Sequence, residues 1–296
     1  AVEVDSTAPA LARWRASLAR DSSDLGALLG VATITRLTYE DASADRLYAM
    51  VAAATAPGSS YAAWAALGRA ESRLYHAPLD SASAWFVTAV KAARSANDSV
   101  AVAQALFGLT ISRLRRESAA VALPIVDSGL GLAPRRDPAL VAQGRCSRAA
   151  VLGLSADPRS VEEGIRGLAL ARQASDLRRE TFCLDMLGAS AGAVGDHARS
   201  AALLDTAVTV ARRARDRRGV ALALWWRGNF ELEVYDHDAA RRDLSSALVE
   251  AEASGNEFIA GWGWLRLAVV SWHFGDLLSA RRELEGFVAR TNRLTE

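Results

Sequence analysis

A motif of about 40 residues recurs along this chain of 296 residues and constrains its fold more than any other feature. The dipeptides Gly195-Asp196, Tyr235-Asp236 and Gly275-Asp276 follow one another at steps of 40 residues. A small residue recurs upstream of each turn in the same register. The residues of this register are Gly30, Gly68, Gly108, Ala149, Gly188, Gly228 and Ala268. Self-similarity at such a period indicates a repeat architecture of about seven units.

Each unit has the pattern of two amphipathic helices. In the unit that starts near Tyr61, apolar and small residues recur at the three- and four-residue steps of a helix. They are Trp64, Leu67 and Gly68, then Ala82, Phe86 and Ala89. One helix pair cannot bury both of its faces, so each pair is expected to pack on the next. Gly68 and its equivalents allow a close helix approach, and the Gly-Asp pairs reverse the chain and cap the second helix.

The segment Trp64-x-x-Leu67-Gly68 followed by Ala82-x-x-x-Phe86-x-x-Ala89 resembles the tetratricopeptide repeat (TPR). The resemblance covers about residues 22–292, but its period is near 40 rather than about 34 residues. Four repeats also lack the usual aromatic residue of the first helix. They carry Glu71, Ala191, Glu231 and Ser271 there. Long-period arrays of this kind are similar to those of bacterial signalling proteins.

Two narrower alternatives accompany this resemblance. The stretch Leu25–Tyr39 with the units after it looks like the region that precedes CHAT-type caspase-like protease domains. HEAT-type repeats share the period and are the alternative architecture. Lys91 is the only lysine beside many arginines, a bias typical of a GC-rich bacterial genome.

The expected fold is therefore all-α: a right-handed superhelical solenoid of about seven antiparallel helix pairs. Residues 1–21 are expected to form an N-terminal segment and capping helix, with Pro9 in the first turn of a helix that runs to Arg20. Residues 22–296 are expected to form the repeat array, with boundaries near 58, 98, 137, 177, 217 and 257.

Composition excludes several classes of function. The net charge is +1, from 35 basic and 34 acidic residues, so the sequence does not favour nucleic-acid binding. No apolar run approaches the roughly 20 residues of a membrane-spanning helix. Cys146 and Cys183 lack metal-ligand spacing, and we expect two buried free thiols. The sequence begins at Ala1 without Met, so the cytoplasm is favoured while export after signal cleavage stays open.

No catalytic, metal or cofactor site is expected. The segment Gly188-Ala-Ser190-Ala-Gly192 matches the G-x-S-x-G nucleophile elbow, but it falls within a repeat helix instead of a strand-to-helix turn. His197 and His237 follow equivalent turns 40 residues apart and so reflect repeat symmetry rather than convergence on one metal. We therefore expect a protein that is not an enzyme.

The TPR resemblance implies that the first helix of each pair lines a concave groove. The groove positions that it selects in the C-terminal half are Trp225, Asn229, Trp262, Leu265, Val269, Trp272 and His273. Large amphipathic rings are typical of binding hot spots, although aromatic residues at helical spacing also pack in cores. Trp64 and Trp264 occupy a packing position and are expected in the core.

The same offsets select Arg69, Arg73 and Arg113 in the N-terminal half. Arginines there would suit an acidic peptide or a terminal carboxylate, unless they are solvated or paired with Glu71 and its neighbours. The expected function is a scaffold that binds a peptide or protein segment in the groove. The alternative is a regulatory or substrate-recognition region of a larger protein, such as a CHAT-type protease. The partner and the oligomeric state stay open.

Overall fold

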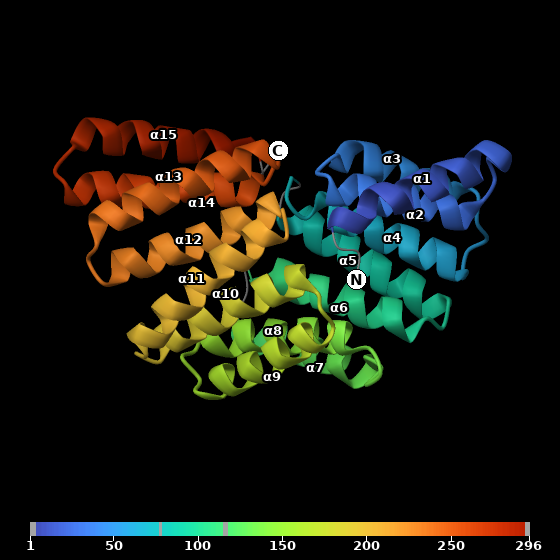
Figure 1. Ribbon diagram of the computed structural model, residues 1–296, viewed down its shortest axis with the longest axis horizontal. Helices are drawn as coiled ribbons and strands as arrows, with labels where there is room; N and C mark the ends of the chain where they lie inside the picture. The colour runs from blue at the N-terminus through green and yellow to red at the C-terminus, as the bar shows by residue number, and fades with distance from the viewer. Residues whose placement is uncertain (1–3, 77–78, 115–117, 294–296) are drawn as a thin grey trace. The chain divides into compact units, whose positions relative to one another are not determined.

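The computed structural model describes residues 4–76, 79–114 and 118–293 (Figure 1). These residues form fifteen α-helices and no strand, which confirms the all-α prediction. The chain divides into two compact parts, Ala1–Gly144 and Arg145–Glu296, called here the N-terminal part and the C-terminal part. None of the helices in the described residues combines the length and hydropathy that a membrane span requires.

The helices follow the repeat pattern as one cap and seven antiparallel pairs. The cap is α1 (Val4–Arg20). The first helices of the pairs, called A helices, are α2 (Leu25–Leu37), α4 (Ser60–Arg73), α6 (Ser99–Leu114), α8 (Pro138–Gly153), α10 (Leu177–Ala193), α12 (Arg217–Glu233) and α14 (Glu257–His273). The second helices, called B helices, are α3 (Asp41–Ala53), α5 (Leu79–Ser95), α7 (Ala119–Leu132), α9 (Arg159–Gln173), α11 (His197–Arg213), α13 (His237–Ala253) and α15 (Leu277–Arg293).

The recurring glycine of the A helices receives a bulky side chain from a neighbouring helix. A Cβ at Gly68 would lie 2.3 Å from the ring of Tyr48, and a Cβ at Gly108 would lie 2.1 Å from Phe86. In the C-terminal part the approaching side chain is a leucine, with Leu244 at 2.7 Å from a Cβ at Gly228. The predicted close approach is confirmed, and it explains why the register keeps small residues.

This packing predicts opposite signs for two glycine-to-alanine substitutions. Gly68→Ala should lower the free energy of unfolding by about 1–2 kcal/mol, because overpacking against Tyr48 outweighs the better helix propensity of alanine. Gly131→Ala on α7, where a Cβ would meet nothing within 4 Å, should raise it by up to about 1 kcal/mol. Urea denaturation followed by circular dichroism measures both. Equal effects at the two sites would contradict the packing role of Gly68.

The turns within the last three pairs follow the predicted chemistry. Gly195, Tyr235 and Gly275 have φ values of +86°, +64° and +74°, which place them in the left-handed region. The next residue caps the B helix through its carboxylate. Asp196 accepts a hydrogen bond from the backbone N–H of Arg199, and the other two turns repeat this bond. Each repeat thus closes with a glycine-like turn and an aspartate cap.

The cap differs from the sequence prediction at its start. Pro9 was expected in the first turn, but α1 begins at Val4 and Pro9 lies inside the helix. A proline this near the start removes only one backbone hydrogen bond, so the helix extends past it. The ring of Trp14 lies against Gly30, within 2.4 Å of a Cβ placed there. The predicted capping role of this helix is confirmed, because Trp14 takes the place that a preceding B helix supplies elsewhere.

The two cysteines form a disulfide, so the expectation of free thiols is wrong. Cys146 lies on α8 and Cys183 on α10, and their Cα atoms are 5.2 Å apart. Both side chains are fully buried. The cysteines are 37 residues apart, close to one repeat period, which puts them on facing sides of neighbouring A helices. Spacing that suits no metal site is therefore compatible with a crosslink between successive repeats.

Candidate functional site

The A helices of the C-terminal part present an apolar surface on the side away from their B helices. On α14, Trp262, Leu265 and Val269 follow one another at steps of three and four residues, so they lie on one face of the helix. On the adjacent α12, Trp225 and Trp226 take the equivalent face. All five side chains are partly buried. These five residues are called here the aromatic face.

The rings of the aromatic face are held in place by other rings. Trp225 and Trp226 meet edge to face, with ring centroids 4.9 Å apart. Trp262 lies between Phe258 and Phe287, at centroid distances of 6.2 and 5.9 Å. The indole N–H groups of Trp225 and Trp226 are buried and have no hydrogen-bond partner. Sequence reasoning missed Trp226, which occupies the offset next to Trp225.

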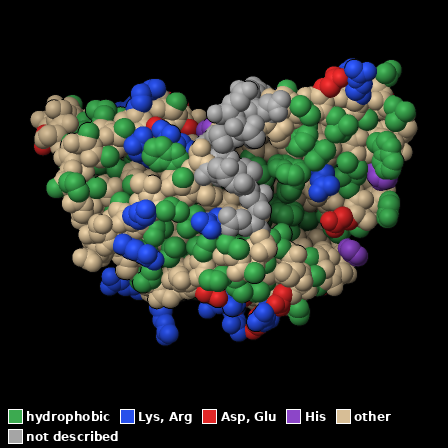
Figure 2. Space-filling model, turned by 180° about the vertical axis from the view of Figure 1, so that it is seen from behind, with side chains coloured by type: hydrophobic (Ala, Val, Ile, Leu, Met, Phe, Trp, Pro, Cys, Tyr) green, Lys and Arg blue, Asp and Glu red, His purple; other side chains and the backbone are tan. Residues whose placement is uncertain are grey.

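Other selected residues of the C-terminal part are placed differently from one another. Asn229 is buried, and its side-chain amide donates to the carbonyl oxygen of Trp225 at 2.6 Å. Trp272 is 62% exposed and touches the ring of His273. His273 stacks on His237, with centroids 4.4 Å apart. Figure 2 shows histidine side chains among hydrophobic ones along the edge of the molecule on this side. Asn229 therefore orders α12 locally, whereas Trp272 reaches solvent.

The two tryptophans of the packing position are partly buried. Trp64 packs on the core of the second pair, and its indole N–H donates to Asp98 at 3.0 Å. Trp264 packs on the core between α12 and α14, and a Cβ at Gly286 would lie 3.1 Å from its ring. Both rings thus contact the core while part of each stays accessible.

Arg69 and Arg73 in the N-terminal part share one carboxylate. Arg69 donates to Asp45 at 3.0 Å, and Arg73 donates to its other oxygen at 2.7 Å. Both guanidinium groups also lie over the ring of Trp85, at 4.7 and 4.0 Å from its centroid. Although burial opposes it, the hydrogen bonds from Arg73 and Arg69 lower the pKa of Asp45. These two arginines are therefore already engaged, by a partner that the sequence did not reveal.

The neighbouring charges of the N-terminal part are also paired. Glu71, which sequence reasoning offered as the partner of these arginines, instead forms an ion pair with Arg36 at 2.9 Å. Arg113 lies partly buried on α6, with its Nε inside the protein. The structure thus brings Arg69 and Arg73 together and places Arg113 on a different A helix.

Asp185 is a buried acid at a groove offset. It lies on α10, 40 residues before Trp225, and is fully buried with no hydrogen-bond partner for either oxygen. Burial raises the pKa of Asp185 well above its usual range, and the negative charge of Asp216 adds to this. The sequence gives one signal for it, a carboxylate where the next two repeats carry tryptophan and leucine.

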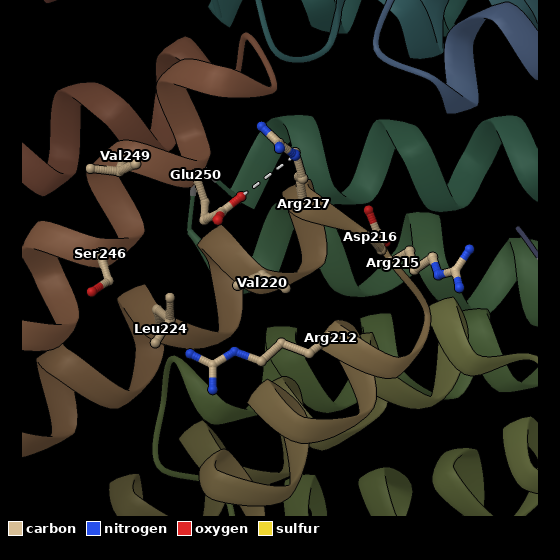
Figure 3. A pocket seen from close by; sticks show the side chains of 9 residues that line it. All are labelled: Arg212, Arg215, Asp216, Arg217, Val220, Leu224, Ser246, Val249 and Glu250. Atoms are coloured by element: carbon tan, nitrogen blue, oxygen red, sulfur yellow. Dashed lines mark ion pairs between the residues drawn. The ribbon is translucent and has the colours of Figure 1, made fainter.

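A surface hollow lies elsewhere in the C-terminal part, at the turn between α11 and α12 (Figure 3). It is lined by Arg212, Arg215, Asp216, Arg217, Val220, Leu224, Ser246, Val249 and Glu250. Arg217 lies 3.9 Å from Glu250, so part of its charge is internally matched. Figure 3 shows Arg212 and Arg217 reaching out on either side of Val220. The mixed charges and exposed arginines make this hollow a weaker candidate than the aromatic face.

Neither metal nor nucleophile chemistry is built into the described residues. They contain no group of three or more His, Cys, Asp or Glu side chains that could hold a metal ion. Ser190 of the G-x-S-x-G match is buried in the middle of α10, where its Oγ lies 3.2 Å from a Cβ at Gly153. That segment packs helices together and is no exposed elbow.

Glu231 gives the C-terminal part a pH dependence. Its carboxylate lies 4.0 Å from Arg227, which also binds Asp205 at 2.8 Å and Asp243 at 2.9 Å. Burial, followed by the negative charge of Asp243, raises the pKa of Glu231 to about 7. The folded protein therefore holds this proton over a range in which the unfolded chain releases it.

Stability should therefore fall as the pH rises from about 4.5 to about 7 and stay level above that range. Glu231→Gln should remove this slope and raise the free energy of unfolding above pH 7 by about 1–2 kcal/mol, after allowance for solvent screening. Melting temperatures across this pH range measure the effect. Glu233→Gln, at an exposed position of the same helix, controls for the loss of one negative charge. Parallel pH profiles for wild type and Glu231→Gln would contradict the assignment.

Comparison with known proteins identifies the fold. No protein-family model matches the sequence, and no curated protein matches it. Among solved structures, a Rap protein complexed with Competence and Sporulation Factor aligns with a TM-score of 0.66 and 12% identity, over 93% of this chain and 78% of that one. The quorum sensor NprR from B. thuringiensis, in its apo form, aligns with a TM-score of 0.61 and 14% identity, over 90% and 76%.

A third similar structure belongs to a larger protein. It is a Signal Transduction ATPase with Numerous Domains (STAND) protein with a tetratricopeptide repeat sensor from Pyrococcus horikoshii. It aligns with a TM-score of 0.54 and 13% identity, over 94% of this chain and 43% of that one. At these identities the likeness concerns the fold. The fold is a TPR-type helical repeat array, as the sequence predicted.

Proposed function

We propose that this chain is a non-enzymatic scaffold that binds a peptide or protein segment on the aromatic face. The observation that carries the proposal is the aromatic face itself: five large apolar side chains on two adjacent A helices, all partly accessible. Half-buried aromatic rings fixed by their neighbours contribute much of the binding energy of protein interfaces, because they lose little freedom on binding.

The chemistry of this surface defines the ligand. Trp225, Trp262 and Leu265 offer apolar area, and no arginine or lysine belongs to the aromatic face. A segment with two or more large apolar side chains fits it better than an acidic one. Arg69 and Arg73 would bind an acidic ligand only by exchanging Asp45 for it, so we assign them the lesser role. The Rap structure, which was solved with a bound factor, supports a binding role for this kind of fold.

An array of immobilised peptides of varied composition tests the proposal. Labelled wild-type protein should bind a subset of sequences rich in large apolar residues. Leu265→Glu should abolish this binding, because it places a charge at the centre of the aromatic face. Val249→Glu, at a 63% exposed position of α13, is the matched control and should bind as wild type does. If Leu265→Glu bound the same peptides as Val249→Glu, the aromatic face would not be the binding site.

The alternative function is a regulatory or substrate-recognition region within a longer protein, such as a CHAT-type protease. The observation that favours it is the STAND protein, in which an array similar to this one accounts for less than half of the chain. The sequence that flanks residues 1–296 in the native gene distinguishes the two. A catalytic domain there would assign this chain a regulatory role, with the aromatic face as its recognition surface.

A further inference from the structure

The B helices of the C-terminal part are covered by the A helix that follows them. On α13, Leu248 packs 3.8 Å from a Cβ at Gly263 of α14, and Arg241 donates to Ser271 at 3.3 Å. On α11, Asp205 pairs with Arg227 of α12 at 2.8 Å. Each covered face therefore combines apolar residues with one or two charged residues that bind the next helix.

The face of α15 repeats this pattern in the same register but stays uncovered in the described structure. Leu284 and Val288 follow Leu244 and Leu248 by 40 residues. Leu244 is fully buried and Leu248 is 8% exposed, whereas Leu284 is 44% exposed and Val288 is 51% exposed. The difference arises because the described residues place no helix where α14 covers α13.

The charges of α15 are also repeated. Arg281 takes the register position of Arg241, and Glu285 takes that of Asp205 two repeats earlier. On α15 these two side chains pair with each other at 2.9 Å and are 79% and 61% exposed. Such an exposed pair within one helix is weak and easily exchanged. Glu285 can therefore turn to an arginine, as Asp205 does, and Arg281 to a hydroxyl or carboxylate.

We propose that this outer face of α15 docks an amphipathic helix of a partner protein. The docked helix presents an apolar stripe to Leu284 and Val288 and an arginine to Glu285, which is the chemistry that α12 presents to α11. The position continues the stacking of A helices on B helices that α12 and α14 already show. This site is separate from the aromatic face and does not depend on the proposed function.

A labelled peptide with the sequence of α12, Arg217–Glu233, is the probe, because it carries Arg227 in the required register. Titration of this peptide with the full chain, followed by fluorescence anisotropy, should show saturable binding. Leu284→Glu should weaken the binding by at least about tenfold, because it buries a charge in the apolar stripe. Val249→Glu is the matched control and should bind as wild type does. A peptide carrying Arg227→Glu should bind about fivefold more weakly, because it would repel Glu285.

Two further measurements keep the test decisive. Val288→Glu provides a second variant, and thermal melting checks that both variants are folded. The proposal is overturned if wild type does not bind the peptide, or if folded Leu284→Glu and Val288→Glu variants bind it as wild type does. It is also overturned if light scattering shows a wild-type dimer that Leu284→Glu dissociates, since the face would then bind a second copy of this chain.

Discussion

Reduction of the disulfide between Cys146 and Cys183 is expected to lower the free energy of unfolding more than any other single change. The bond closes a loop of 37 residues between neighbouring A helices. In the chain-entropy account, such a crosslink destabilises the unfolded state by about 4 kcal/mol. A repeat array relies on contacts between neighbours, so the loss should concentrate where α8 meets α10.

Urea denaturation with and without a thiol reductant measures this effect. The midpoint of wild type should fall on reduction, whereas the Cys146→Ala/Cys183→Ala double variant should not respond to reductant. Alkylation of the denatured protein without reductant, followed by mass spectrometry, provides the chemical control. Two alkylated cysteines in that control would restore the free-thiol prediction. Disulfides persist mainly in oxidising compartments, so an intact bond in the native host would favour export over the cytoplasm.

Two tryptophans on α14 should differ strongly in their effect on stability. Trp264 packs on the core between α12 and α14, and its ring touches α15 beside Gly286. Trp264→Ala should lower the free energy of unfolding by about 3 kcal/mol, because it leaves a cavity at this junction. Trp272 is 62% exposed, and Trp272→Ala should change stability by less than about 1 kcal/mol.

Thermal midpoints of the two variants, measured side by side, check this difference. Both substitutions remove the same side chain from the same helix, so helix propensity cancels between them. Equal destabilisation by the two variants would show that Trp272 also belongs to the core. The contacts between Trp264 and α15 would then carry less of the stability than the structure indicates.

Helix positions were predictable because the repeat imposes them. Gly68 and Gly228 recur for a steric reason that acts in every repeat, so the register alone located the helix contacts. The turns at Gly195 and Gly275 were equally readable, since glycine and aspartate have specific roles there. Periodicity reports such features because each repeat solves the same packing problem.

Features that occur once were not readable from periodicity. The disulfide joins Cys146 and Cys183, residues whose spacing differs from the period, and only the stacking of α8 and α10 brings them together. Asp45 was missed as the partner of Arg69 and Arg73 because it lies on the B helix of the preceding repeat. The burial of each aromatic residue depends on the side chains opposite it, which no offset along a single helix reveals.

The central claim is that the aromatic face binds an apolar peptide segment. Its most direct test follows the indole N–H signals of the isotopically labelled protein by NMR while a peptide selected on the array is added. The account predicts that the signals of Trp225 and Trp262 shift, while those of Trp64 and Trp85 in the N-terminal part stay unchanged. Shifts confined to Trp64 and Trp85, with Trp225 and Trp262 unaffected, would contradict it.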